Sequence, residues 1–136
     1  MKKYLAFIFI VAACSTAFVA CGQQQFSGTI SNGYKGDKVS FTLSADKKTI
    51  TDLTFSGHWR CSGKIESITV GPDKGIPVKN GEVNAVVLDP ETGGSTAWRF
   101  ALDGVIKGKT ASGTFRMSIV NLGCDTYVLK WTANGK

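Results

Sequence analysis

The residues with the most evident chemistry stand side by side at positions 55–61, which read FSGHWRC. This segment holds the only histidine of the chain, His58, together with Cys61. Imidazole and thiolate bind zinc, but a zinc site takes three or four ligands and there is no second histidine to supply one. A histidine base can also activate a serine, yet the sequence has no G-x-S-x-G elbow. We therefore expect no catalytic residue, no metal and no cofactor here, and we do not expect an enzyme.

A disulfide bond is a better explanation for Cys61 than a metal site. An exported chain with an even number of remaining cysteines usually pairs them, and Cys61 and Cys124 remain once the first 21 residues are set aside. Closing a loop over the 63 positions between them contributes about 4 kcal/mol in the chain-entropy model. His58 then lies alone on the solvent side of its strand, where its substitution is expected to cost about 0.5 kcal/mol or less. Trp59 shares the buried side with Leu53 and Phe55.

The start of the chain has the pattern of an export signal. Lys2 and Lys3 precede a stretch without charge that runs to Ala20. A spanning helix needs about 20 apolar residues, and the polar residues at 14–16 interrupt this shorter run. We therefore expect residues 1–21 to be a signal peptide that directs the chain to the cell envelope.

The end of this segment, FVACG at 18–22, resembles the lipobox of bacterial lipoproteins. The resemblance implies that Cys21 is lipidated and that the protein meets a membrane through this anchor, in the outer membrane or facing the periplasm. The run VAAC at 11–14 also fits, so Cys14 is the alternative. Cys21 is preferred because a polar tether, residues 22–25, follows it. Two or more acyl chains hold a protein stably on a membrane.

The charge of the mature chain is mild. Loss of Lys2 and Lys3 lowers the Lys plus Arg count from 16 to 14 against 10 acids, which leaves a net charge of +4. The basic residues are scattered, and no nucleic-acid-binding module is visible, so we expect no nucleic-acid partner. Residues 26–136 have the length of one ordinary domain.

Two-residue alternation of apolar and polar residues dominates this domain and predicts half-buried strands. The ranges are 26–31, 38–44, 49–57, 64–70, 82–88, 96–106, 111–119 and 126–133. Gly, Asp and Asn between short strands favour an all-β fold, a single antiparallel β-sandwich or small barrel of about eight strands with one disulfide. The apolar parity breaks after Ile50, which predicts a β-bulge near Thr51 and Asp52.

Several longer segments carry a second resemblance. The segments are KVSFTLSADKKTITDLTFSG, Cys61, IPVKNGEV, FALDGVIKGKTASGTFRM and CDTYVLKWTA. Together they are similar to a group of small secreted bacterial domains that has no assigned activity. The resemblance implies a β-sandwich with one disulfide, and it implies no chemistry.

Two features remain as candidate binding surfaces. The loop at 89–94, DPETGG, has two carboxylates for calcium, but a turn between strands explains the same residues. Among the aromatics, Trp98, Tyr127 and Trp131 share the parity of core residues. Tyr34 lies in a polar loop, so Tyr34 and Trp59 are the candidate ligand-binding residues.

The sequence favours a non-catalytic binding or interaction module whose partner is an envelope protein or a glycan. The alternative is a periplasmic inhibitor of a hydrolase such as lysozyme, and a hydrolytic enzyme is the least favoured class. The sequence names no specific ligand.

Overall fold

The computed structural model describes residues 22–136, and the expected signal peptide and Cys21 lie outside the described residues. The ten strands are β1 (Gln24–Ile30), β2 (Lys38–Leu43), β3 (Thr49–Cys61), β4 (Lys64–Val70), β5 (Ile76–Pro77), β6 (Glu82–Asp89), β7 (Trp98–Lys107), β8 (Thr110–Ile119), β9 (Cys124–Asp125) and β10 (Leu129–Gly135). One 3₁₀ turn, η1 (Val120–Leu122), precedes β9. Two expected tether residues, Gln24 and Gln25, belong to β1. Within residues 22–136, no helix has the length and apolar character needed to cross a bilayer.

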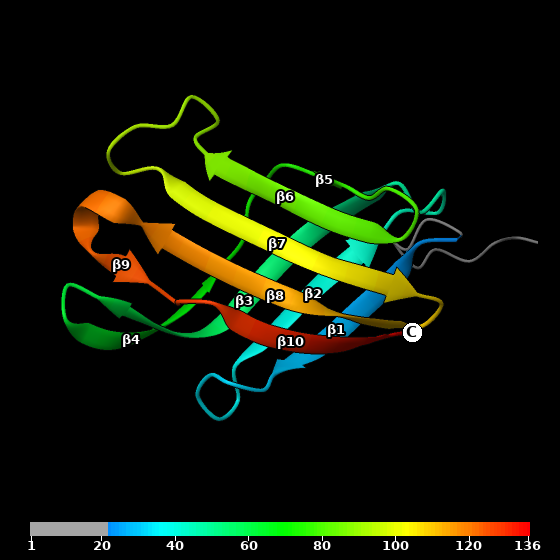
Figure 1. Cartoon of the computed structure of the whole chain (residues 1–136), viewed down its shortest axis with the longest axis horizontal. Coiled ribbons are helices and arrows are strands. Elements are labelled where there is room, and N and C mark those ends of the chain that lie inside the picture. Colours follow the sequence, from blue (N-terminus) through cyan, green and yellow to red (C-terminus); the bar gives the residue numbers. More distant parts are fainter. Residues whose placement is uncertain (1–21) are drawn as a thin grey trace, which may run out of the picture.

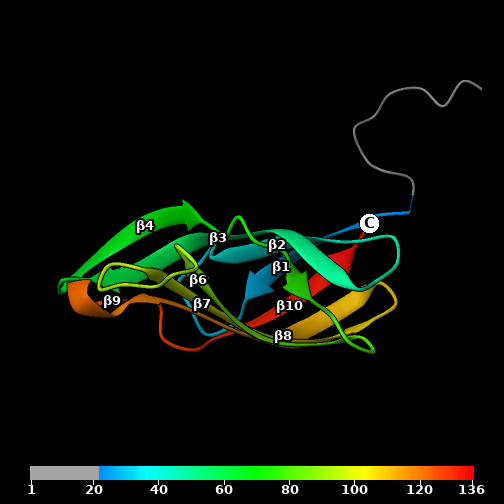
Figure 2. The same cartoon turned by 90° about the horizontal axis from the view of Figure 1, so that it is seen from above.

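The strands form an antiparallel barrel with extensions, as the sequence predicted for the fold class. The ring is closed by six strands in the order β1, β2, β3, β9, β8 and β10. β4 and β5 pair with the outer edge of β3, while β7 and β6 continue the sheet from β8. The strands of the two layers cross in Figure 1, and Figure 2 shows the layers edge-on.

The core fills the space between the layers. Its largest fully buried side chains are Trp131, Phe26, Phe55, Phe100, Phe115, Ile50, Ile76, Leu102, Met117 and Val39. They come from alternate strand positions, so the period-two pattern and the buried side agree. Trp59 belongs to this core and stacks on Trp98 with ring centroids 5.2 Å apart.

The predicted bulge is present in β3. The register between β2 and β3 shifts between Ser40 and Thr42, and Asp52 adopts φ 53°. The extra residue returns Leu53 to the buried side, which keeps the apolar face of β3 continuous. The predicted disulfide is also present and links Cys61 in β3 to Cys124 in β9, with Cα atoms 3.9 Å apart.

The two ends of the domain are clearly separated. In both Figure 1 and Figure 2, the start of β1 and the C-terminus lie at one end, whereas β9, η1 and the β3–β4 turn lie at the other. Gly22, which precedes β1, therefore lies at the end of the domain opposite to the disulfide.

Candidate functional site

His58 has a partner that the sequence did not indicate. Its Nδ1 lies 2.7 Å from Oδ1 of Asp37, and its backbone N–H donates to the same oxygen at 3.1 Å. The side chain of His58 is 35% exposed, and that of Asp37 is 1% exposed. The expectation of a lone histidine was therefore wrong. Asp37 stands 21 positions earlier, and only the pairing of β2 with β3 brings the two residues together.

Asp37 fills a gap in the sheet. β2 pairs with β3 up to Ser56, and β9 joins the same edge of β3 at Arg60, so on this edge no strand pairs with His58, whose other edge pairs with β4. The Asp37 carboxylate takes the place of the missing strand by accepting the His58 N–H. Its second oxygen accepts the N–H of Tyr34 at 2.9 Å. With these donors the buried carboxylate is satisfied, as burial of a charge requires.

The surrounding glycines leave room for this carboxylate. A Cβ on Gly57 would lie 2.7 Å from Cγ of Asp37, and a Cβ on Gly33 would lie 2.7 Å from its Oδ2. No other residue type fits at either position without displacing the carboxylate. The corner formed by Asp37, His58, Gly33 and Gly57, which we call the Asp37 corner, is thus built around one buried charge.

The outer face of the same strands carries a regular set of hydroxyl groups that the sequence analysis missed. Four neighbouring strands each carry two Ser or Thr residues separated by one buried or half-buried residue, and all of these hydroxyl residues except the buried Thr42 are half-buried or exposed. We call this set the hydroxyl face; its members are Ser27 and Thr29 in β1, Ser40 and Thr42 in β2, Thr54 and Ser56 in β3, and Ser67 and Thr69 in β4. The signal that could have revealed it is the recurrence of this spacing in successive predicted strands.

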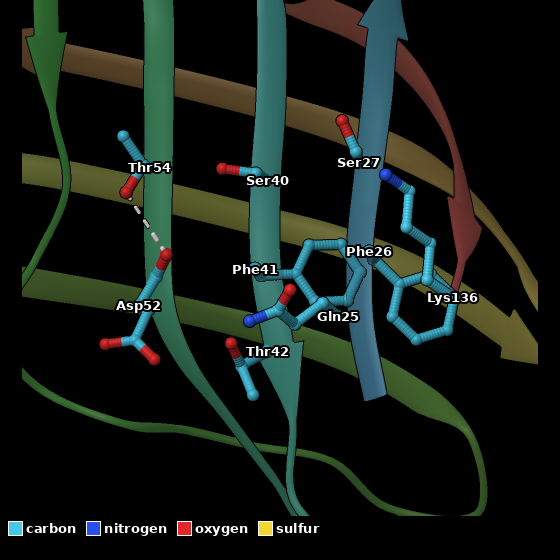
Figure 3. A pocket seen from close by; sticks show the side chains of 9 residues that line it. All are labelled: Gln25, Phe26, Ser27, Ser40, Phe41, Thr42, Asp52, Thr54 and Lys136. Carbon is cyan, nitrogen blue, oxygen red and sulfur yellow. Dashed lines mark hydrogen bonds between the residues drawn. The ribbon is translucent and has the colours of Figure 1, made fainter. Parts of the chain in front are cut away.

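The register aligns these hydroxyl residues into rows that run across the strands. Ser27 lies opposite Ser40, and Ser40 lies opposite Thr54. Figure 3 shows this row, with the three side chains projecting from neighbouring strands on one side of the sheet. The next row runs across four strands from Thr29 on β1 to Lys38 on β2, Ser56 on β3 and Thr69 on β4, and each residue lies opposite the one before it. Neighbouring strands are about 4.7–4.9 Å apart, so the face is an array of hydroxyls at a fixed spacing.

Shallow hollows lie on this face. One of about 410 Å³ is lined by residues that include Ser27, Ser40, Thr54 and Asp52 (Figure 3). A second of about 280 Å³ is lined by Lys35, His58, Ser56, Ser67 and Thr69. Both hollows are shallow and open, and their linings expose apolar as well as polar atoms, so an extended ligand can lie along the surface.

Few of these hydroxyls are occupied by other protein groups. Ser56 and Thr69 hydrogen bond to each other at 3.0 Å, and Thr54 donates to the backbone oxygen of Asp52 at 3.1 Å. Ser27, Ser40 and Ser67 make no side-chain hydrogen bond within residues 22–136. A hydroxyl both donates and accepts, so the array can exchange hydrogen bonds with a ligand that does the same.

The aromatic residues singled out in the sequence differ in how exposed they are. Tyr34 is 47% exposed, and its ring lies 5.1 Å from that of His58, at the end of the hydroxyl face. Trp59 is only 6% exposed and presents no ring to a ligand. Tyr127 was expected in the core but is 60% exposed, because φ 57° turns it out of the strand pattern. Among residues 22–136, no group of three or more His, Cys, Asp and Glu side chains is placed to hold a metal ion.

Tyr127 is held in place by a second acidic residue. Asp125 accepts the Tyr127 N–H at 2.6 Å and two hydrogen bonds from Arg116, at 3.0 and 2.5 Å. Partial burial raises the pKa of the Asp125 carboxyl, but the hydrogen bonds from Arg116 and Tyr127 outweigh it and lower the pKa below the ordinary value. Asp125 therefore stabilises the turn after β9 in its charged form.

No protein-family model, no curated protein and no solved structure matches this chain.

Proposed function

We propose that this protein is a non-catalytic, glycan-binding module of the bacterial cell envelope. The observation that carries the proposal is the hydroxyl face, where four neighbouring strands hold Ser and Thr side chains in register. A rigid sheet positions these short side chains with little loss of conformational entropy on binding. Their natural complement is a ligand with many hydroxyl groups of its own, which is a polysaccharide chain.

The composition of the face favours a glycan over a protein partner. Protein interfaces depend on a few large anchors, usually Trp, Tyr or Arg, and serine is depleted in them. The hydroxyl face has no such anchor at its centre, and Tyr34 stands only at its end. A sugar chain needs many moderate hydrogen bonds and tolerates bridging water, and the face can supply both.

The direct test is binding of soluble polysaccharides to the full-length protein in a non-ionic detergent. We expect at least one polysaccharide to bind, measured by affinity electrophoresis and calorimetry. A variant with S40A, T54V, S56A and T69V should bind it about tenfold more weakly, because it loses four hydroxyls and keeps the shape of the sheet. The matched control, S112A with T114V, changes the same residue types on β8 and should bind like the wild type. Equal binding by both variants, or no binding to any polysaccharide, would refute the proposal.

The membrane anchor is a separate part of the proposal. Lipidation at Cys21 would place the tether at the end of the barrel where β1 begins, which leaves the hydroxyl face open along the side. Radiolabelled palmitate should enter the wild-type protein in a bacterial host and should not enter the C21S variant. Labelling that persists in C21S and disappears in C14S would move the anchor to Cys14.

Inhibition of an envelope hydrolase is a second candidate, favoured by the loop between β6 and β7. Pro90, Glu91 and Thr92 are exposed, and the loop projects beyond the strands it joins (Figure 1). Glu91 forms an exposed ion pair with Lys74, which connects the loop to the segment between β4 and β5. Titration of the protein into a lysozyme assay tests this function, and full lysozyme activity at a large excess of the protein would exclude that target.

A further inference from the structure

We propose that the hydroxyl face selects an acidic polysaccharide, a chain whose sugars carry carboxylate or sulfate groups. The inference rests on the proposed glycan-binding function and adds the charge of the ligand to it. The group that selects the charge is the ammonium of Lys38.

Lys38 lies within the array of hydroxyls. In the register of the sheet it lies between Thr29 on β1 and Ser56 on β3, at the position where a further hydroxyl would continue the row. Val39, the next residue, is buried, so Lys38 points to the outer side. It is exposed and makes no salt bridge within residues 22–136. A chain lying across the row would therefore meet hydroxyls on both sides of one positive charge.

The neighbouring charges reinforce this selection. Lys35 is exposed and lines the hollow that also contains Ser67 and Thr69. The nearby carboxylate of Asp37 is covered, with 1% of its side chain exposed, and His58 lies against it. The exposed carboxylate on the face is that of Asp52, which lies at the bulge beside the other hollow. The half of the face around Lys38 is thus positive, and an anionic ligand complements it.

The test compares polymers that differ in charge. The probes are alginate, which carries carboxylates, dextran sulfate, which carries sulfates, neutral dextran, and polyglutamate as a charged chain without sugars. We expect at least one acidic polysaccharide to bind the full-length protein about tenfold more tightly than dextran at 50 mM salt. This preference should shrink as salt rises, because screening weakens exposed charges. A difference between alginate and dextran sulfate identifies which acidic group is preferred.

Two variants test which residues of the hydroxyl face set the preference for acidic chains. K38Q should remove most of the preference for acidic chains and keep the melting temperature, and its loss of affinity for dextran should be much smaller than its loss for the acidic chains. D52N should strengthen binding of acidic chains about twofold to threefold, and asparagine accepts the positive φ of this position. The matched control is K107Q, which removes the same charge from the exposed last residue of β7 and should bind like the wild type.

The outcomes separate the two proposals. Equal affinity for dextran and the acidic chains would refute the charge selection while the glycan function stands. Polyglutamate bound as tightly as alginate, or equal losses in K38Q and K107Q, would show attraction to any polyanion and would also refute the selection. Absence of binding to every polysaccharide would refute both proposals.

Discussion

The Asp37 corner and the hydroxyl face share strand β3, yet their polar groups differ in how they are hydrogen bonded. In the corner, the carboxylate of Asp37 accepts three hydrogen bonds from His58 and Tyr34. On the face, Ser27, Ser40 and Ser67 make no side-chain hydrogen bond with any part of residues 22–136. Burial makes this difference, because a buried polar group without a partner is costly and an exposed one is solvated by water. The corner should therefore govern stability, and the face should govern binding.

The largest effect on stability should come from the disulfide next to the corner. The double variant C61A/C124A should lower the free energy of unfolding by about 2–5 kcal/mol, because the bond no longer constrains the unfolded chain. Urea denaturation under oxidising conditions measures the change. Reduced wild-type protein should unfold like the variant. If the variant and the oxidised wild type share one midpoint, the link between β3 and β9 does not stabilise this end of the barrel.

The next largest effect should come from the buried carboxylate. D37A removes the acceptor for the N–H groups of His58 and Tyr34 and should cost about 2–4 kcal/mol. The control D73A removes an exposed carboxylate and should stay within about 0.5 kcal/mol. Thermal unfolding followed by circular dichroism compares the two. A melting temperature of D37A equal to that of D73A would contradict the role we assign to the corner.

A smaller effect, which depends on pH, should come from Asp125. The folded state lowers the pKa of its carboxyl, so this group stabilises the fold above its unfolded pKa, and the contribution disappears as the pH falls through the folded pKa. Because the pair with Arg116 is partly exposed, D125N should cost about 0.5–1 kcal/mol at pH 7. The gap between the variant and the wild type should narrow as the pH falls below the ordinary pKa of an aspartate carboxyl. Urea midpoints across this range measure the difference, and a constant gap would contradict the charged role of Asp125.

The smallest effect on stability should come from the hydroxyl face itself. The variant with S40A, T54V, S56A and T69V should unfold within about 1 kcal/mol of the wild type, because surface changes are individually small and valine favours strands. The same thermal unfolding experiment checks this expectation. A loss of several kcal/mol would mean that the hydroxyls are structural, and the comparison between corner and face would fail.

Much of the architecture could be predicted because its signals are local. Alternation such as Val39, Phe41 and Leu43 shows which side of a strand is buried, and these residues are in the core. The parity break after Ile50 showed the bulge at Asp52. Two cysteines in the expected mature chain left one disulfide pairing, which the structure contains. Tyr127 failed the same alternation rule, since its positive φ depends on the hydrogen bonds to Asp125.

The sequence by itself determined the long strands, most of their buried sides and the cysteine pair, because each depends on residue type and short spacing, but it did not indicate the two-residue strands β5 and β9. Only the tertiary structure decided which strands are neighbours, and both surfaces depend on that choice. Asp37 meets His58 because β2 starts at Lys38, opposite Ser56, and β9 joins the same edge of β3 only at Arg60. The hydroxyls of Ser27, Ser40 and Thr54 form a row because β1, β2 and β3 pair in one register. A shift of one residue in that register would turn each hydroxyl to the opposite side of the sheet.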